Sequence, residues 1–266
     1  MIQPFVSIIL PTYNGNHIWL SQAIKSVLSQ IYENRELIII NDASTNNIEY
    51  TILEYQEREP RIKYYKNESN IQLTKTLNKG IALSKGMYIA RIDDDDIWFD
   101  PMKLEKQIKF MEANQNVGLC WTSVIDINEE GEDISYINVP QSDRDIRDRL
   151  MRFNQFAHAS VVFRQEVVQT VWFYDPIYNG AEDYELRLRI GTRYKFANLP
   201  DYCIKYRHNT KGISAKKKWK QGRYGIKIAH IYRHYYPYFW YYIIPRLIIL
   251  LFPRYLITLL IKWLKK

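Results

Sequence analysis

Cysteine is scarce in this chain of 266 residues. The two that occur, Cys120 and Cys203, lie in apolar or strand-like stretches, and no CxxC pair is present. A reducing compartment is therefore favoured over a disulfide scaffold. No secretory leader is expected either, because Met1 leads directly into a strand-like segment without a basic region. A chain of this length has enough material for one large domain or two small ones.

Acidic residues are absent from the last part of the chain. Residues 203–266 contain 15 Lys or Arg and no Asp or Glu. The whole chain has 37 basic and 29 acidic residues, so residues 1–202 hold the remaining 22 basic and all 29 acidic ones, a net charge of −7. An acidic body thus carries a basic tail, which would bind nucleic acid or an anionic membrane surface. The aliphatic stretch Ile243–Leu264 is unlike a nucleic-acid arm, so we expect an anionic membrane surface and no nucleic-acid partner.

An uninterrupted transmembrane run is also missing. Charged residues divide the apolar segment Tyr235–Leu264, and each Arg at the bilayer centre costs roughly 2.5–3.5 kcal/mol on insertion scales. Pro245 and Pro253 are expected to break the segment into short helices. The alternative is a helical pair that packs on the rest of the chain or on a second subunit as a homodimer. We favour an interfacial anchor with residues 235–242 at the lipid headgroups and with lysines on anionic lipid, namely Lys216–Lys220, Lys262, Lys265 and Lys266.

Short apolar runs alternate with segments of helical period along the first 120 residues. This order is typical of right-handed βαβ units, so we expect an α/β fold with a Rossmann-like, mostly parallel sheet and helices on both faces. The expected strands are Val6–Leu10, Glu36–Ile40, Ile62–Tyr65 and Met87–Ile92. The expected helices are His17–Gln30, Asn46–Arg58 and Ile71–Ser84.

The second half has a looser pattern. It contains two further strand candidates, Val117–Val124 and Ala157–Phe163, and a charged surface helix at Asp143–Phe153. Asn179-Gly180 marks a turn. Glu182–Ile190 then has a helical pattern, with acids in its first turn where they favour the helix dipole. This half is expected to share the sheet.

Four consecutive aspartates, Asp93–Asp96, follow the apolar run Met87–Ile92. Carboxylates crowded at the end of a buried strand repel one another unless a cation or a donor-rich ligand lies there. In an open α/β sheet, ligands bind outside the carboxyl ends of the strands, so these acids would face a substrate. Carboxylates suit Mg²⁺ or Mn²⁺, which bridge to nucleotide phosphates. The alternative is a solvated turn or a helix cap.

Two other strand ends carry residues able to contact a nucleotide. The first ends in Pro11-Thr-Tyr-Asn, a geometry able to lay Tyr13 against a planar base, although strand-end packing explains it as well. The second ends at Asp42, which would accept hydrogen bonds from a base or ribose, or would cap the helix beginning near Thr45. Each motif alone leaves both interpretations open.

Six segments together resemble glycosyltransferase family 2 in order and spacing, over roughly residues 4–210. The resemblance implies a GT-A fold and an inverting transfer from a nucleotide sugar. We accordingly expect a catalytic domain at 1–212, with a nucleotide-binding half at 1–100 and an acceptor half at 101–212, and a helical membrane-associating tail at 213–266. The six segments are Ser7–Asn14, Ile40–Ser44, Asn78–Gly80, Lys85–Ile89, Ile92–Trp98 and Glu182–Arg189.

The resemblance also implies roles for individual residues. Pro11 and Tyr13 would form the walls of the base pocket, and Asp42 would accept a hydrogen bond from the base amide. Asp183 corresponds to the general base, which takes a proton from the acceptor hydroxyl. Glu182 would orient it.

The acidic motif implies a metal site. Asp93 would lie near the ribose, Asp94 would also contact the nucleotide, and Asp95 would bind Mn²⁺ or Mg²⁺. His208 follows the last core strand and would approach the metal or the diphosphate. His158 would lie on the acceptor side, although a purely structural histidine is the alternative.

One loop departs from the family pattern. Family members often have Gly and Arg where this chain has Gln72 and Leu77, which puts a diphosphate contact from this loop in doubt. Lys75 would substitute for it, or is a solvated helix lysine.

The residues as a whole predict a metal-dependent glycosyltransferase, peripheral or monotopic on the cytoplasmic face of the cell membrane. It would move a sugar from a nucleotide sugar, expected to be UDP-linked, to a lipid-linked or polysaccharide acceptor in envelope or capsule synthesis. One alternative is a sugar nucleotidyltransferase, which would need a glycine-rich basic loop after the first strand, and Pro11–Gly15 is not such a loop. A catalytically inactive membrane adaptor is the other, and the intact acids argue against it.

Overall fold

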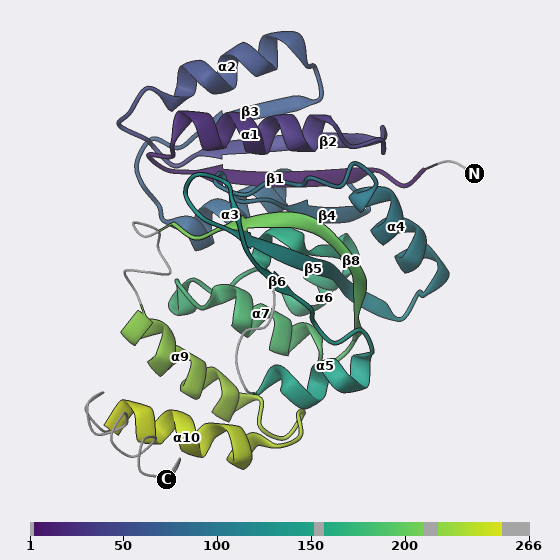
Figure 1. The fold of residues 1–266 in the computed structure, drawn as a ribbon, viewed down its shortest axis with the longest axis vertical. Coiled ribbons are helices and arrows are strands. Elements are labelled where there is room, and N and C mark those ends of the chain that lie inside the picture. The colour runs from purple at the N-terminus through teal and green to yellow at the C-terminus, as the bar shows by residue number, and fades with distance from the viewer. Residues whose placement is uncertain (1–2, 152–156, 210–217, 252–266) are drawn as a thin grey trace.

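The computed structural model describes residues 3–151, 157–209 and 218–251. They form one eight-stranded sheet with helices packed around it (Figure 1). The strands are β1 (Val6–Thr12), β2 (Arg35–Asn41), β3 (Ile62–Lys66), β4 (Tyr88–Arg91), β5 (Val117–Ile127), β6 (Asp133–Ile137), β7 (Val162–Arg164) and β8 (Lys195–Arg207). The helices are α1 (His17–Leu28), α2 (Ile48–Arg58), α3 (Leu73–Leu83), α4 (Lys103–Ala113), α5 (Asp143–Leu150), α6 (Gln165–Val171), α7 (Glu182–Ile190), α9 (Lys218–Ile231) and α10 (Phe239–Leu251), with 3-10 helices η1 (His158–Ser160) and η2 (Pro176–Tyr178).

Parallel pairing in the first half builds one polar edge of the sheet. The strand order is β3-β2-β1-β4-β7-β5-β6, and β8 also pairs with β5. β1 is parallel to both β2 and β4, and β2 is parallel to β3, so their carboxyl ends lie at the same edge. β6 pairs antiparallel with β5, and β7 pairs antiparallel with both β4 and β5. β8 runs parallel to β5. The predicted α/β class with a mostly parallel sheet is confirmed.

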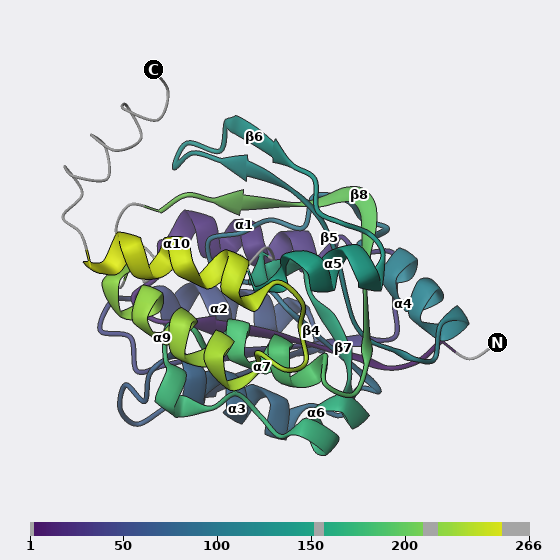
Figure 2. The same ribbon diagram turned by 90° about the horizontal axis from the view of Figure 1, so that it is seen from below.

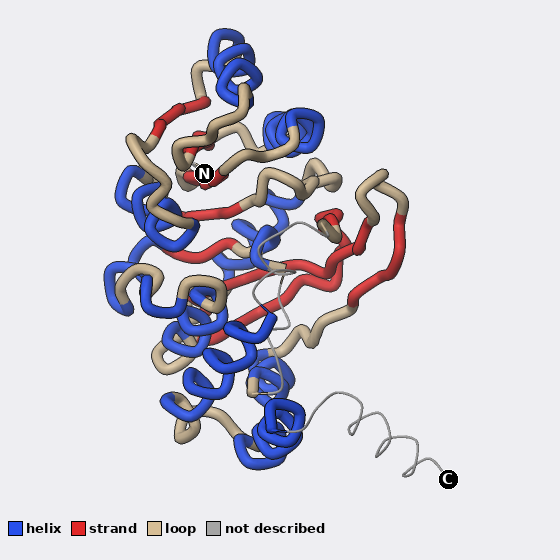
Figure 3. Tube along the Cα trace, turned by 90° about the vertical axis from the view of Figure 1, so that its left-hand side faces the viewer, coloured by secondary structure: helices blue, strands red, loops and turns tan. Residues whose placement is uncertain are grey.

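Helices cover the sheet on both faces. All residues of β1 are buried as a result. Ile8 and Leu10 pack with residues of α1, α2 and α4 on one face, while Ile9 packs with residues of α3 and α7 on the other. Successive side chains of a strand point to opposite faces, so an unbroken apolar run is what a doubly covered strand requires. Figure 3 shows the helices on either side of the strands.

The strand predicted at 157–163 is wrong over most of its length. Residues 158–160 form η1 instead, and only Val162–Arg164 pairs as β7. The Ser160 N–H donates to the Ala157 carbonyl at 3.0 Å, which closes a turn where a strand would need extended backbone. β7 then fills the gap between β4 and β5.

β6, α6 and β8 were not predicted, and β8 shows a physical reason. Its sequence mixes polar and apolar residues and contains Pro200, which cannot donate a ladder hydrogen bond. The pairing with β5 jumps from Leu199 to Tyr202 at that point, so an irregularity accommodates the proline. The helix predicted at Asp143–Phe153 is described as α5 to Leu150, and residues 152–156 lie outside the described residues.

The described part of the C-terminal segment packs against the body. α9 and α10 lie side by side next to α7 (Figure 2). Ile228, Tyr236 and Ile243 are buried there and join the apolar cluster of that face of the sheet. Among the described residues, no helix is both long enough and apolar enough to cross a bilayer.

The helix break expected at Pro245 is wrong, because α10 continues through it. A proline inside a helix costs roughly 3 kcal/mol. Burial of Phe239 and Ile243 on the inner side of the same helix offsets that cost. Pro253, Lys262 and the other predicted lipid-contacting lysines at 216–217 and 265–266 lie outside the described residues.

Lys103 is a fully buried lysine on α4 and gives a test of the packing. Its Nζ donates to Gln107 Oε1 at 2.7 Å and lies 3.9 Å from the Trp98 ring centroid. Burial lowers the pKa of Lys103 to about 7. The unfolded lysine titrates near 10.4, so between these pH values the unfolded state binds more protons and this group makes folding more favourable as pH rises.

We therefore expect Lys103→Met to gain stability relative to wild type near neutral pH. This advantage in unfolding free energy should shrink by about 1.4 kcal/mol per pH unit between about pH 7.5 and 9.5. Denaturant titrations at several pH values measure it. Lys109→Met, on the exposed side of the same helix, is the control and should show no slope. Equal slopes for both variants would contradict a depressed pKa at Lys103.

Candidate active site

Side chains tie the carboxyl ends of β1, β2 and β4 together. Thr12 Oγ1 donates to Asp94 Oδ2 at 2.5 Å and so joins β1 to the aspartates that follow β4. Asn14 Oδ1 accepts from the Thr45 N–H at 2.7 Å, and the Asn14 N–H donates to Ser44 Oγ at 2.9 Å. Asn14 has a positive φ of 52°, a conformation that asparagine tolerates better than most residues. Three loops thus converge on one edge of the sheet.

The residues predicted to contact the base lie at this edge. Pro11 is buried in β1 opposite Ile40 of β2. Tyr13 lies just beyond the strand and is 49% exposed, which leaves its ring accessible to a ligand. Lys75 is exposed on α3. The roles assigned to these residues remain predictions.

Asp42 is buried and its carboxylate holds the loop between β3 and α3. Oδ1 accepts from Asn67 Nδ2 at 2.8 Å and from the Ile71 N–H at 2.9 Å. Oδ2 accepts from the Gln72 N–H at 2.9 Å. A carboxylate has roughly four acceptor positions, so one remains for a base amide. That contact stays a prediction, whereas the loop-holding role is observed.

Gln72 occupies the position where the family often has glycine. Its φ of 71° and ψ of 157° lie in a region that residues with a side chain rarely adopt. The strained residue is held on both sides, because its N–H binds Asp42 and its Oε1 accepts from Asn179 Nδ2. The backbone at this position therefore has a conformation that glycine adopts more readily than glutamine.

Arg91, at the end of β4, holds the first of the four aspartates. The buried guanidinium donates from both terminal nitrogens to the two oxygens of Asp93. Burial opposes the charge, but the carboxylates around it, with Asp93 foremost, raise the pKa of Arg91. Glu182 and Asp183 at the start of α7 contribute to this rise. Arg91 thus links the aspartate motif electrostatically to α7.

The next three aspartates crowd together. Burial and the neighbouring Asp95 raise the pKa of Asp94 to about 8. Burial and Asp93 raise the pKa of Asp95 to about 6. Asp96 is fully buried, where one oxygen accepts from the Arg207 N–H at 2.8 Å and the other has no partner in the described part of the chain. The motif therefore contains more carboxyl groups than its protein partners stabilise in the charged form.

This donor set fits a divalent cation. Asp93 is engaged by Arg91 and Asp94 by Thr12, whereas the Asp95 side chain accepts from Asn209 Nδ2 at a long distance of 3.4 Å. Within the described ranges, no three His, Cys, Asp or Glu side chains are arranged to hold an ion by themselves. A magnesium-type site needs only one or two carboxylates when substrate phosphates supply the other oxygens.

Asp183 lies at the N-terminus of α7 with partial exposure. Its Oδ1 accepts from the Tyr184 N–H at 2.8 Å, and Oδ2 lies 3.5 Å from a guanidinium nitrogen of the buried Arg187. Glu182 is buried and accepts from the Gly180 N–H. Burial and the adjacent Asp183 raise the pKa of Glu182.

A small pocket opens beside Asp183. Its polar lining consists of Asp183, Arg187, His158 and Tyr174. His158 Nε2 lies 2.7 Å from the Tyr174 hydroxyl. Burial, with Arg91 and Arg187 nearby, lowers the pKa of His158 well below its usual value, so the ring is neutral at physiological pH. The predicted acceptor-side histidine therefore lies beside the predicted base.

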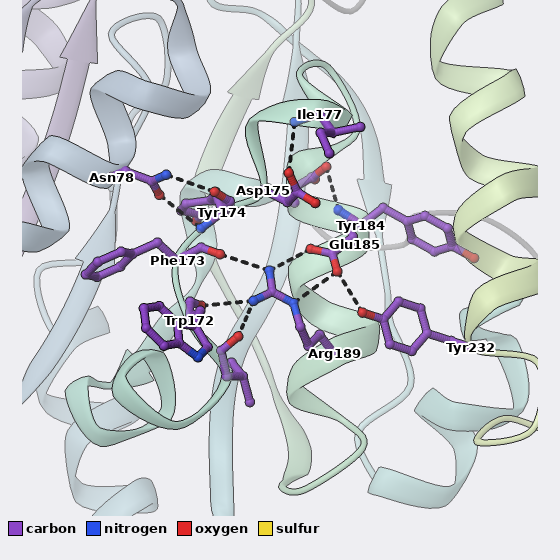
Figure 4. Close-up of polar contacts among 12 residues, drawn as sticks. Asn78, Trp172, Phe173, Tyr174, Asp175, Ile177, Tyr184, Glu185, Arg189 and Tyr232 are labelled. Carbon is purple, nitrogen blue, oxygen red and sulfur yellow. Dashed lines mark hydrogen bonds and ion pairs between the residues drawn. The ribbon is translucent and has the colours of Figure 1, made fainter.

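The loop that carries Tyr174 is clamped from two sides (Figure 4). Asn78 of α3 exchanges hydrogen bonds of 2.8 and 2.9 Å with the Tyr174 backbone. Arg189 of α7 donates to the carbonyls of Trp172 and Phe173 while it pairs with Glu185. These contacts fix the wall of the pocket relative to α7.

His208 contacts a different acid from those of the metal motif. Its Nε2 lies 3.0 Å from Asp126 Oδ2, and its ring packs edge-on against Tyr206. The ring is more than half exposed. Its predicted approach to a metal is untested, while the neighbouring Arg207 does contact the motif through Asp95 and Asp96.

Three residues of the site were not predicted, namely Arg91, Arg187 and Tyr174. The sequence contains an indication of Arg91, because it is a charged residue inside an otherwise apolar strand. Arg187 also had one, because it follows Asp183 by one helical turn, the spacing of an ion pair. Tyr174 had none, since only the folded loop brings it to His158.

Comparisons with known proteins agree with this geometry. A family model described as "Glycosyl transferase family 2" matches residues 7–172. An uncharacterised glycosyltransferase of Methanocaldococcus jannaschii is 29% identical over 98% of this chain and 94% of its own length. The O-antigen biosynthesis glycosyltransferase WbnJ of Escherichia coli is 33% identical over 78% of this chain and 82% of its own length.

Solved structures show the same fold at low identity. TarS of S. aureus, in complex with UDP-GlcNAc, has a TM-score of 0.69 at 14% identity over 85% of this chain. A mannosyltransferase of Pyrobaculum calidifontis, with GDP-Man and Mn²⁺, has a TM-score of 0.65 at 17% identity over 86%. This chain covers 66% and 64% of those two chains. The fold is GT-A, and because the family model covers more than half of the sequence, the chain belongs to glycosyltransferase family 2.

Proposed function

We propose that this glycosyltransferase moves a sugar, with inversion, from a UDP-linked donor to a lipid-linked or polysaccharide acceptor in cell-envelope synthesis. One observation carries the proposal: Arg91 binds Asp93 directly and has its pKa raised by Asp183 and Glu182, so the aspartate motif and the candidate base face one buried cation. Relatives named for O-antigen and amylovoran biosynthesis support the acceptor class. The neighbour solved with UDP-GlcNAc supports the donor class.

The residues on the acceptor side would have different roles in the reaction. Asp183 takes the proton of the acceptor hydroxyl, and Arg187, 3.5 Å away, holds its carboxylate in position. Glu182, held by the Gly180 N–H, keeps the first turn of α7 in place. His158 and Tyr174 line the adjacent pocket and would orient the acceptor.

The donor side would use the aspartate motif. Asp95 would hold Mn²⁺ or Mg²⁺, with Asp93 and Asp94 on the nucleotide. The ion would supply positive charge to the departing diphosphate. Tyr13 would cover the base, and Asp42 would accept from it while it keeps the loop at Gln72 in position.

The C-terminal helices would place this site at the cytoplasmic face of a membrane. The exposed side of α10 carries Trp240, Tyr241 and Ile244, whereas Phe239 and Ile243 face the body. An apolar outer face on a segment without acidic residues suits an anionic bilayer surface.

A donor screen tests the proposed function. Thermal unfolding is measured with UDP, GDP, ADP and TDP sugars, each with Mn²⁺ and with EDTA, followed by assays of donor hydrolysis. We expect stabilisation by a UDP sugar that depends on the metal, together with slow hydrolysis. Stabilisation by a different nucleotide would contradict the UDP assignment, and the absence of any metal-dependent donor binding would contradict the transferase proposal.

Arg91 should matter for catalysis more than for folding. Arg91→Lys keeps one charge but cannot hold both oxygens of Asp93, so kcat/KM should fall by roughly 10–100-fold. Arg164→Lys is the matched control, since Arg164 is also buried but donates to Tyr88 and to backbone carbonyls and pairs with Glu112 instead of an acid of the site. Both variants should lose stability. If both variants lost similar amounts of kcat/KM, Arg91 would have only a structural role.

A further inference from the structure

α9 is fixed to the helix that carries the candidate base. Ile228 and Ala229 are buried between them. Beyond the end of α9, the Tyr232 hydroxyl donates to Glu185 and the Tyr236 hydroxyl to the Leu188 carbonyl, both at 2.7 Å. Tyr224 of α9 packs on Tyr178, which precedes α7 in the chain, so α9 and the residues after it follow α7 in the same direction. The N-terminal part of α9 therefore lies at the same end of the molecule as the start of α7 (Figure 1).

Three cations project from that part of α9. Lys220, Arg223 and Lys227 are exposed and share one side of the helix, because they are separated by about one or two turns. Within the part of the chain that the structure describes, none of them belongs to an ion pair with an acidic side chain. The segment from residue 203 onward contains no Asp or Glu at all. No acidic residue of α9 itself therefore neutralises the positive charge on this side of the helix.

Aromatic rings join these cations to the loop before Asp183. Tyr224 packs edge-on against Tyr178 of η2 with ring centroids 5.6 Å apart. Lys220 Nζ lies 5.3 Å from the Tyr224 centroid, and Lys227 Nζ lies 5.8 Å from the Tyr178 centroid. The rings limit where the two ammonium groups can go. The cations thus line one border of the acceptor loop 174–181.

The acids facing this border are already engaged. Asp175 accepts from the Ile177 N–H, and Glu185 pairs with Arg189 and with Tyr232. Apolar side chains adjoin the cations, since Ile177 is 63% exposed beside Tyr178 and Ile231 is 47% exposed one turn after Lys227. A ligand that matches this surface has an anionic group next to a hydrocarbon chain.

We propose that Lys220, Arg223 and Lys227 bind the phosphate groups that join the acceptor sugar to its lipid. A neutral polysaccharide would gain nothing from three cations here, whereas a lipid diphosphate would pair its charges with them and lay its chain along Ile177 and Ile231. This inference rests on the proposed transfer reaction and narrows its acceptor to a phosphate-linked lipid. The acceptor sugar would then lie toward Asp183.

The test measures binding of farnesyl diphosphate to the full chain by calorimetry, with excess UDP and Mn²⁺ present to fill the donor site. The variant carries Lys220→Gln, Arg223→Gln and Lys227→Gln. A control carries Lys25→Gln, Lys63→Gln and Lys109→Gln, which changes the net charge equally at exposed positions elsewhere. We expect wild type and control to bind alike, and the α9 variant to bind at least about tenfold more weakly.

Other ligands separate the sources of the phosphate. Farnesol should not distinguish the proteins, and sodium pyrophosphate should bind more weakly than farnesyl diphosphate. Equal binding by variant and control would overturn the proposal, as would pyrophosphate that binds as tightly as the lipid diphosphate. Loss of binding to vesicles containing phosphatidylglycerol, with farnesyl diphosphate binding unchanged, would assign the cations to the membrane surface instead. UDP-dependent stabilisation is read separately, so a failure of the proposed transfer reaction is recognised independently.

Discussion

Asp183→Asn should lower sugar transfer by roughly 10² to 10⁴-fold while the affinity for donor nucleotide changes little. Asparagine has the same size but cannot take a proton from the acceptor. Its Oδ1 can still accept from the Tyr184 N–H, so the start of α7 should keep its geometry. Arg187 loses its counter-charge, and some thermal stability should be lost with it. Transfer is therefore measured per molecule of bound donor, with donor affinity determined by calorimetry.

Asp175→Asn is a matched control for this variant. The same chemical change is made in the loop before α7, where the Asp175 side chain accepts from the Ile177 N–H, a bond that asparagine retains. Its turnover should stay near that of wild type. If Asp183→Asn lost donor binding but kept transfer per bound donor, Asp183 would be a binding residue, and the base would have to be sought elsewhere in the pocket.

The sequence allowed the first half of the fold to be predicted because the same residues determine both local structure and burial. β1 and β2 are short and rich in β-branched residues, β4 is a short buried strand, and they are separated by helices of clear period. The position of the aspartates at the end of β4 follows directly from that pattern. β8 shows the opposite case, since its pairing accommodates Pro200 through an irregularity that only the partner strand reveals.

The acidic residues of the candidate site could be predicted from the sequence. The residues that hydrogen-bond to the site residues and position them could not. Asp42 was expected to receive a ligand, yet the structure shows three hydrogen bonds from the chain itself. The contact between His158 and Tyr174 depends on a loop that Asn78 and Arg189 clamp from distant parts of the sequence. Such contacts arise from tertiary packing, which periodicity and motif spacing do not encode.

Asp95→Ala should abolish the dependence of donor binding on metal without harming the fold. In the metal-free protein the charged form of Asp95 is unfavourable, because burial and Asp93 raise its pKa to about 6. Its removal relieves repulsion within the motif, so the melting temperature without metal should stay the same or rise. Wild type with UDP and Mn²⁺ at about 100 times the dissociation constant should gain about 2.7 kcal/mol in unfolding free energy, and the variant should gain almost none.

His208→Gln provides the comparison that identifies the second metal contact. If the His208 ring keeps its contact with Asp126 and does not bind the ion, its replacement should leave the Mn²⁺ dependence intact. If donor binding by His208→Gln needs more Mn²⁺, the ring turns from Asp126 to the ion when the donor is present, as the family resemblance implies. Full turnover by Asp95→Ala with unchanged Mn²⁺ dependence would remove Asp95 from the metal site. Asp94 and Asp96 would then be the remaining acids to test, and the hydrogen bond from Thr12 to Asp94 would have to break for Asp94 to take that role.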